Sequence, residues 1–226
     1  MTQLIEALSY PFVQRAIAAG VMISLCAALL GVILVLKQYS LIGHGLGDVG
    51  FASTSLAVAL GLPVMAVSIP IVVIAACLIM FWSQRSKTGG DTAIGMVATG
   101  ALSIGVIITA MSSGFNVDVN GYMFGSILAM SREDVIFSVV LSIVILVLFV
   151  VFYNRLFLIT FDENFAKASG IRVGFYQFLI ALLTALTVVM GMRMMGSLLI
   201  SSLIIFPAVI ARKLVVSFKA VAVLSV

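Results

Sequence analysis

The sequence predicts an all-α bundle of membrane-spanning helices. Apolar residues make up 63% of the 226 residues and charged residues only 9%, and the mean hydropathy is +1.33. Soluble domains are nearer half apolar and one-quarter charged. A soluble enzyme and a disordered chain are therefore both excluded as fold classes. The apolar runs are continuous rather than alternating, which argues against a porin-type barrel.

The apolar runs predict about seven complete spans and the start of an eighth. A spanning helix needs about 20 apolar residues. The expected spans cover 16–36, 44–60, 63–82, 93–113, 135–152, 173–190 and 195–211. Gly61-Leu62-Pro63 predicts a tight turn between the second and the third. Another apolar stretch begins at Leu214 and continues to Val226. We therefore expect a single transmembrane domain, 1–226, that is incomplete at its C-terminus.

The basic residues between the spans predict the orientation. Lys and Arg are enriched in cytoplasmic loops. The richer side of the predicted bundle carries Lys37, Arg85, Lys87, Arg155, Lys167, Arg172, Arg212, Lys213 and Lys219, and the poorer side carries Arg15, Arg132 and Arg193. The first group is therefore cytoplasmic, and the N-terminus lies outside. The basic residues form no patch with interleaved aromatic residues, so no nucleic-acid partner is expected.

Two of the predicted loops have sequence patterns typical of a short helix. The outer segment 121–130 is mostly apolar but too short to cross the bilayer, so it suits a short re-entrant or interfacial helix, or a greasy loop on the surface. In the cytoplasmic loop, Thr160 and Glu163 have capping-box spacing, Asp162 is an alternative cap, and Gly170 can end a helix. This pattern predicts a short cytoplasmic helix within 160–171. Such a helix needs a partner surface, or it rests on the lipid headgroups.

The strongest candidate for chemistry is the pair His44 and Asp48 in the predicted second span. Ionisable residues inside a span are costly and usually functional. His44 is the only histidine in the chain, and a spacing of four residues places both side chains on one face of a helix. Imidazole plus carboxylate suits Zn²⁺ or Mn²⁺. Two ligands suit passing coordination better than a closed site. A His–Asp pair that serves only packing is the plain alternative.

Other sites are not indicated. Cys26 and Cys77 both lie in apolar runs, which predicts packing roles rather than a disulfide or a metal site. The sequence has no His-Glu-x-x-His and no Gly-x-x-x-x-Gly-Lys-Ser/Thr motif. An intramembrane metalloprotease is therefore improbable, and any ATP hydrolysis must belong to another subunit. No permanently bound cofactor is expected.

The segment around His44 resembles the second-span motif of ABC-type permeases for zinc, manganese or iron. In that family the pattern is roughly Leu-Ile-Gly-Asp-x-Leu-Ser-His. Here His44 stands where the family has Asp, Asp48 stands where it has His, and Gly47 replaces Ser. The spacing is kept, so the ligand pair is exchanged rather than lost. Further matches follow in the family's order at 91–95, 124–128, 161–171, 196–200 and 206–211.

The resemblance implies a permease of the cell (inner or cytoplasmic) membrane that imports a divalent metal ion: zinc or manganese, with iron as a further candidate. It implies a second permease copy, a cytoplasmic ATP-binding subunit and an extracytoplasmic metal-binding protein, besides the membrane lipid. His44 and Asp48 would be the metal ligands. The ATPase-coupling positions would be Phe161, Asp162, Glu163, Phe165, Ala166 and Gly170.

Two rival functions stay open at this point. A proton- or ion-coupled secondary metal transporter or channel would use the His44/Asp48 pair as a relay. A self-sufficient transporter has no need of a cytoplasmic docking helix, which argues against it. A subunit that serves only assembly would tolerate alanine at both positions.

Overall fold

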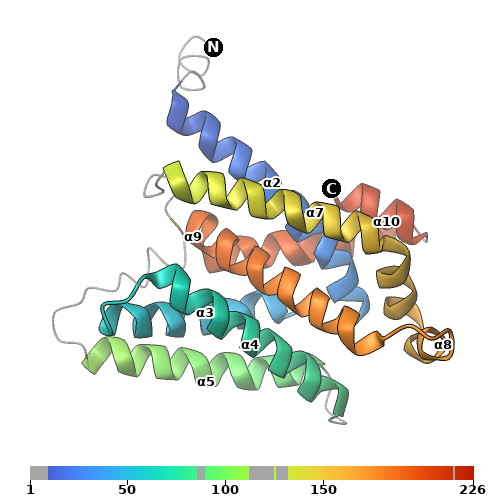
Figure 1. Ribbon diagram of the computed structural model, residues 1–226, viewed down its shortest axis with the longest axis horizontal. Coiled ribbons are helices and arrows are strands. Elements are labelled where there is room, and N and C mark those ends of the chain that lie inside the picture. The colour runs from blue at the N-terminus through green and yellow to red at the C-terminus, as the bar shows by residue number, and fades with distance from the viewer. Residues whose placement is uncertain (1–9, 86–89, 112–124, 126–131, 216) are drawn as a thin grey trace.

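The computed structural model describes residues 10–85, 90–111, 125, 132–215 and 217–226. Every regular element in these ranges is a helix. The helices are α2 (Pro11–Leu36), α3 (Ile42–Ala59), α4 (Val64–Arg85), α5 (Gly90–Met111), α7 (Arg132–Phe161), α8 (Glu163–Ala168), α9 (Val173–Leu214) and α10 (Phe218–Ser225). Figure 1 shows α9 in the middle, with α2, α7 and α10 on one side and α3, α4 and α5 on the other. The predicted all-α class is confirmed.

Five helices among the described residues are long and apolar enough to cross a membrane: α2, α4, α5, α7 and α9. The expected number of seven spans is therefore not confirmed. His44, Asp48 and four glycines make α3 less apolar than the other long helices. Helix α9 is continuous over 42 residues except at Gly196, where φ is 82° and ψ is 163°. At 1.5 Å per residue, 42 residues measure about 63 Å, twice the thickness of the hydrocarbon core. The break at Gly196 therefore divides α9 into two parts that are each about long enough to span.

Local signals account for the helix ends. Helix α3 ends at a left-handed Gly61 (φ 64°), where Gly61 N–H donates to the Val58 carbonyl and Leu62 N–H to the Ala57 carbonyl. The predicted turn before α4 is therefore present. Helix α7 extends to Phe161, nine residues beyond the expected end of the fifth span. Arg155 lies within this extension, where its guanidinium donates to the Tyr176 hydroxyl and lies over that ring.

Small residues let the second half of α9 pack between α2 and α3. A Cβ on Gly31 would lie 1.9 Å from the Ile204 carbonyl oxygen. A Cβ on Gly43 would lie 3.1 Å from Ser201 Cα, and a Cβ on Gly47 would lie 3.1 Å from Ser197 Cβ. Helices in lipid gain little from the hydrophobic effect and associate through such close approaches. We call Gly31, Gly43, Gly47, Ser197, Ser201 and Ile204 the small-residue seam.

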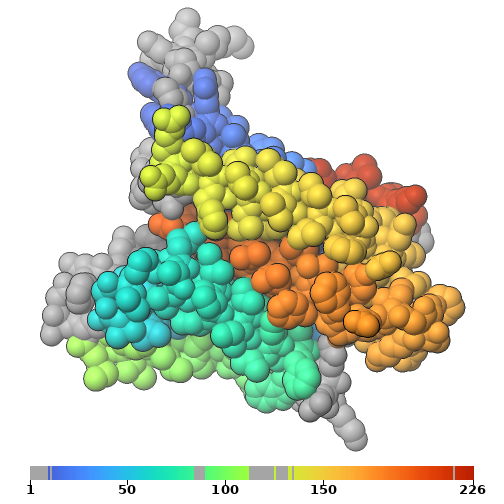
Figure 2. Space-filling model, viewed as in Figure 1, coloured from blue at the N-terminus to red at the C-terminus, as the bar shows by residue number. Residues whose placement is uncertain are grey.

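The outward surface of α7 is apolar along most of its length. Exposed side chains on this helix include Ile136, Phe137, Val140, Ile143, Val144, Val147, Val150 and Val151. This helix runs across the face seen in Figure 2, where it is yellow. An apolar face of this extent is the surface that a spanning helix presents to lipid tails.

Candidate functional site

Glycines hold α3 between two neighbours. Gly43 and Gly47 face α9 through the small-residue seam, while Gly45 faces α5, where a Cβ would lie 2.4 Å from the Ile94 side chain. Further along, a Cβ on Gly105 of α5 would lie 2.8 Å from the Phe51 ring. The backbone of α3 therefore has little room to move sideways. His44 and Asp48 lie on the remaining face of this helix.

His44 and Asp48 are brought together as the spacing predicts. His44 Nε2 lies 3.8 Å from Asp48 Oδ2, and the two side chains are 52% and 15% exposed. That separation is longer than a hydrogen bond, and half of the imidazole is open. The two side chains therefore do not hydrogen-bond directly to each other. Among the described residues, no group of three or more His, Cys, Asp or Glu is placed to hold a metal ion.

The connector before α3 is fixed at several points. Gln38 has a φ of 60°, and Tyr39 is buried with its ring so close to Gly90 that a Cβ there would lie 2.6 Å from it. Burial raises the pKa of the Tyr39 hydroxyl, against a hydrogen bond with Ser83. Leu41 N–H donates to Asp91 Oδ1 at 3.0 Å. The start of α3, one turn before His44, is thereby attached to the start of α5.

A polar hollow of about 350 Å³ opens beside this connector. It is lined by Val35, Gln38, Ser40, Gly90, Asp91, Thr92, Val209 and Arg212. These residues come from the ends of α2 and α9, the connector, and the start of α5. The hollow lies on the side that the basic residues mark as cytoplasmic.

The loop between α7 and α9 contains the short helix α8. Asp162 is its N-cap, accepting from Phe165 N–H at 2.9 Å, while the Thr160 hydroxyl turns back to the Leu156 carbonyl. The alternative cap is thus the one used, and the Thr160/Glu163 capping box is wrong. Gly170 ends the helix with a φ of 77°, and Ile171 N–H donates to the Ala166 carbonyl across it.

The six residues of the predicted coupling set have different environments. Phe161 and Phe165 are 59% and 58% exposed, and Asp162 and Gly170 are also exposed. Ala166 is fully buried and faces the bundle. Glu163 accepts at Oε1 from Lys37 Nζ at 2.7 Å and from Gln177 Nε2 at 2.9 Å. The sequence did not single out Lys37 or Gln177 for such a contact, because each lies far from Glu163 in the chain.

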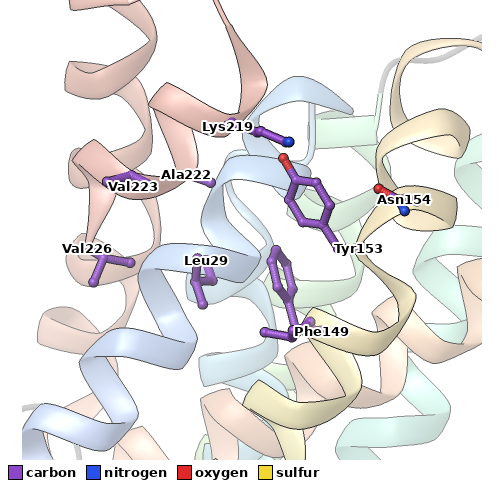
Figure 3. A pocket seen from close by; sticks show the side chains of 9 residues that line it. Leu29, Phe149, Tyr153, Asn154, Lys219, Ala222, Val223 and Val226 are labelled. Atoms are coloured by element: carbon purple, nitrogen blue, oxygen red, sulfur yellow. The ribbon is translucent and has the colours of Figure 1, made fainter.

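Two other regions stand apart from this site. The outer segment 121–130 lies outside the described residues except for Gly125, whose backbone contacts the break at Gly196. A groove of about 530 Å³ lies between α2, α7 and α10. Figure 3 shows Leu29, Phe149, Val223 and Val226 along it, with Tyr153, Asn154 and Lys219 bringing polar atoms to one end. It shares no residue with the His44/Asp48 region.

These features define a class: a multi-pass helical membrane protein with a His–Asp pair on a glycine-held helix and a short capped helix between two long ones. The family model described as the ABC 3 transport family matches residues 9–226. The chain belongs to this family. It is a membrane-spanning permease subunit of the cell membrane.

Relatives and solved structures agree with this assignment. The manganese transport system membrane protein MntC of Halalkalibacterium halodurans is 29% identical over 91% of this chain and 70% of its own length. The high-affinity zinc uptake system membrane protein ZnuB of Haemophilus influenzae is 31% identical over 88% of this chain and 76% of its own. The structure of PsaBC from Streptococcus pneumoniae in complex with Fab superposes with a TM-score of 0.83 at 29% identity, covering 99% of this chain and 81% of the matched chain.

Proposed function

We propose that this protein is the permease subunit of an ATP-driven importer of a divalent transition metal ion, manganese or zinc. The observation that carries the proposal is the open His44/Asp48 pair on α3. Relatives described as manganese and zinc transport proteins support the choice of metals. The sequence motif also leaves iron as a further candidate.

The distance between the two ligands suits a passing ion. Two ligands about 2.1 Å from a metal in tetrahedral geometry lie about 3.4 Å apart. The observed separation of 3.8 Å therefore needs only a small side-chain rotation to close. Imidazole nitrogen and carboxylate oxygen bind both Mn²⁺ and Zn²⁺. A site with two protein ligands leaves the ion's other positions to water or to a partner, which favours release over trapping.

The proposal includes three protein partners. A cytoplasmic ATP-binding subunit must supply the energy, because this sequence has no phosphate-binding Gly-x-x-x-x-Gly-Lys-Ser/Thr motif. Helix α8 and the two residues before it, with Phe161, Asp162 and Phe165 exposed, form the surface on which it would dock. An extracytoplasmic binding protein would deliver the metal. A second copy of the permease would complete the path beside the open face of α3.

The experiment purifies the whole protein from its native membrane together with its co-purifying subunits. The complex is reconstituted into proteoliposomes, and uptake of Mn²⁺ or Zn²⁺ is measured with and without ATP and metal-loaded binding protein. The double variant His44→Ala/Asp48→Ala should lose uptake by about 100-fold, the upper end of what even indirect metal partners cost. Glu133→Ala, which removes an exposed carboxylate from the start of α7, is the matched control and should keep uptake.

A further variant tests whether the pair acts through its chemistry or its order. His44→Asp/Asp48→His keeps one imidazole and one carboxylate at the same spacing, so uptake should stay within about threefold of wild type, well inside the loss expected when a metal partner is removed. Uptake that continues without ATP would instead support a secondary transporter. An ATPase complex that is indifferent to the alanine pair would place the metal path elsewhere.

A further inference from the structure

A three-residue polar contact attaches α8 to the bundle. Lys37 at the end of α2 and Gln177 of α9 both donate to the same Glu163 oxygen, at 2.7 Å and 2.9 Å. The Lys37 side chain is only 9% exposed, and that of Glu163 is 35% exposed. Among the described residues, this ion pair links the C-terminal end of α2 to the start of α8. We call Lys37, Glu163 and Gln177 the α8 clamp.

The surroundings of the clamp favour the ionised form of Glu163. A nearly buried lysine is costly unless a carboxylate and further hydrogen bonds compensate it. Burial opposes ionisation of Glu163, but the hydrogen bond and charge of Lys37, together with Gln177 and Lys167, hold the Glu163 pKa below its ordinary value. Removing the Glu163 carboxylate would leave Lys37 nearly buried without its ion-pair partner. The contact is therefore costly to break.

The clamp joins α8 to the helix that carries the ligand pair. Lys37 is the C-cap of α2 and the first residue of the connector to α3. That connector is held by the buried Tyr39 and by the bond from Leu41 N–H to Asp91. His44 follows within the first turn of α3. A displacement of α8 that is carried by Lys37 therefore reaches α3 through a short, tightly held segment.

We propose that Lys37, Glu163 and Gln177 are positioning residues of the transport cycle. They transmit movement of α8 to the connector before α3 and so couple the ATP-binding subunit to the His44/Asp48 pair. This inference rests on the proposed function, since it needs a partner that moves α8. It assigns to Lys37 and Gln177 a role beyond anchoring a loop.

The test uses charge exchange in the reconstituted complex. Lys37→Glu and Glu163→Lys each place like charges at the clamp, and Lys37→Glu/Glu163→Lys restores opposite charges in reversed order. The readouts are ATP hydrolysis without binding protein, its stimulation by metal-loaded binding protein, and metal uptake. Each single variant should lose stimulation and uptake by about tenfold, within the usual range of coupling between two sites. The double variant should regain most of both.

Two variants separate coupling from folding. Glu163→Gln removes the charge at constant size and should reduce stimulation with the ATP-binding subunit still attached. Lys219→Glu makes the same charge change at an exposed lysine of α10 and should behave like wild type. Assembly is checked for every variant by co-purification of the ATP-binding subunit.

The outcomes are distinct. Wild-type uptake without any dependence on ATP would remove the proposed function itself. Normal ATP-dependent uptake by wild type and by all clamp variants would overturn only the clamp. If every clamp variant including the charge exchange fails to assemble, the contact is a folding element and the inference is wrong. Recovery in the double variant is the result that a general folding defect does not give.

Discussion

Helix α8 and the start of helix α3 are linked through Lys37 and the connector that follows it, but opposite means hold the two helices. Helix α3 is positioned by missing side chains: Gly43, Gly45 and Gly47 bring its backbone against α9 and α5. Helix α8 is positioned by side chains that are present, namely the Asp162 cap and the Glu163 ion pair. The difference follows from the surroundings. Between helices in lipid, close backbone approach is the main source of contact energy, whereas a helix of six residues outside the lipid depends on caps and partners.

Helices α3 and α8 also differ in which of their parts are fixed and which are exposed. The same helix that the glycines fix leaves His44 half exposed and 3.8 Å from Asp48. Under the proposed function, this fixed backbone would present the two donors at a defined place without trapping the ion. Helix α8 has the reverse arrangement, because its buried Ala166 and its clamp are tight and its one phenylalanine, Phe165, is exposed. That arrangement suits a surface on which a partner protein docks.

The largest effect is expected for Gly31→Ala in α2, which breaks the part of the small-residue seam that holds α9 beside α3. The new Cβ would fall 1.9 Å from the Ile204 carbonyl oxygen, which is backbone and cannot turn aside. The helices must separate, so we expect a loss of about 3 kcal/mol in the free energy of unfolding. Thermal unfolding of the detergent-purified protein measures it. Gly100→Ala, where a Cβ meets nothing within 4 Å, is the control. Equal stability of the two variants would mean that the small-residue seam is not tight.

The all-helical class and the proximity of His44 and Asp48 were predictable from sequence because both depend on short-range pattern. Apolar runs give the helices, and a spacing of four residues places His44 and Asp48 on one face. The turn at Gly61 and the end of α8 at Gly170 follow from glycines at left-handed positions. The number of spans was less predictable. The sequence placed two spans, 173–190 and 195–211, where the structure has α9 with its break at Gly196, whereas the predicted second span became α3, which is not among the five helices that are long and apolar enough to span.

The α8 clamp was not predictable because its members are distant in the chain. Lys37 and Glu163 are 126 positions apart, and Leu41 and Asp91 are 50 apart. The basic pattern assigned Lys37 to the cytoplasmic side but gave it no partner. Likewise, Ala166 belongs to the expected coupling set, yet it is fully buried, so it can act only by packing. Which residues of a short helix face outward is decided by the bundle it rests on.

Phe165→Ala tests whether the exposed surface of α8 binds the ATP-binding subunit. This ring is 58% exposed and makes little of the contact within the bundle, so its removal should leave thermal stability unchanged. Affinity for the ATP-binding subunit should fall about tenfold, a usual loss for a central aromatic residue of an interface. Co-purification at graded salt and detergent measures it. Phe175→Ala removes a similarly exposed ring (55%) from α9 and should retain the subunit. Loss of the subunit in both variants would show a general defect rather than docking through α8.

The smallest expected effect is the response of α8 to acid, which tests whether charge rather than packing holds it. The pKa of Glu163 is lowered in the folded protein, because the charge and hydrogen bonds of its neighbours outweigh burial. A carboxyl group with a depressed folded pKa contributes its stability above the unfolded value, here 4.5, and loses it as pH falls through the folded value. Hydrogen exchange at α8, corrected for the intrinsic pH dependence, should therefore be steady from pH 8 to about pH 5 and rise below about pH 4.5. Partial exposure of the pair keeps the change modest. Glu163→Gln should abolish this acid response and give faster exchange at neutral pH. Exchange at α8 that is already rising between pH 7 and 6 in wild type, or an unchanged acid response in the variant, would show that packing rather than the Glu163 charge holds the helix in place.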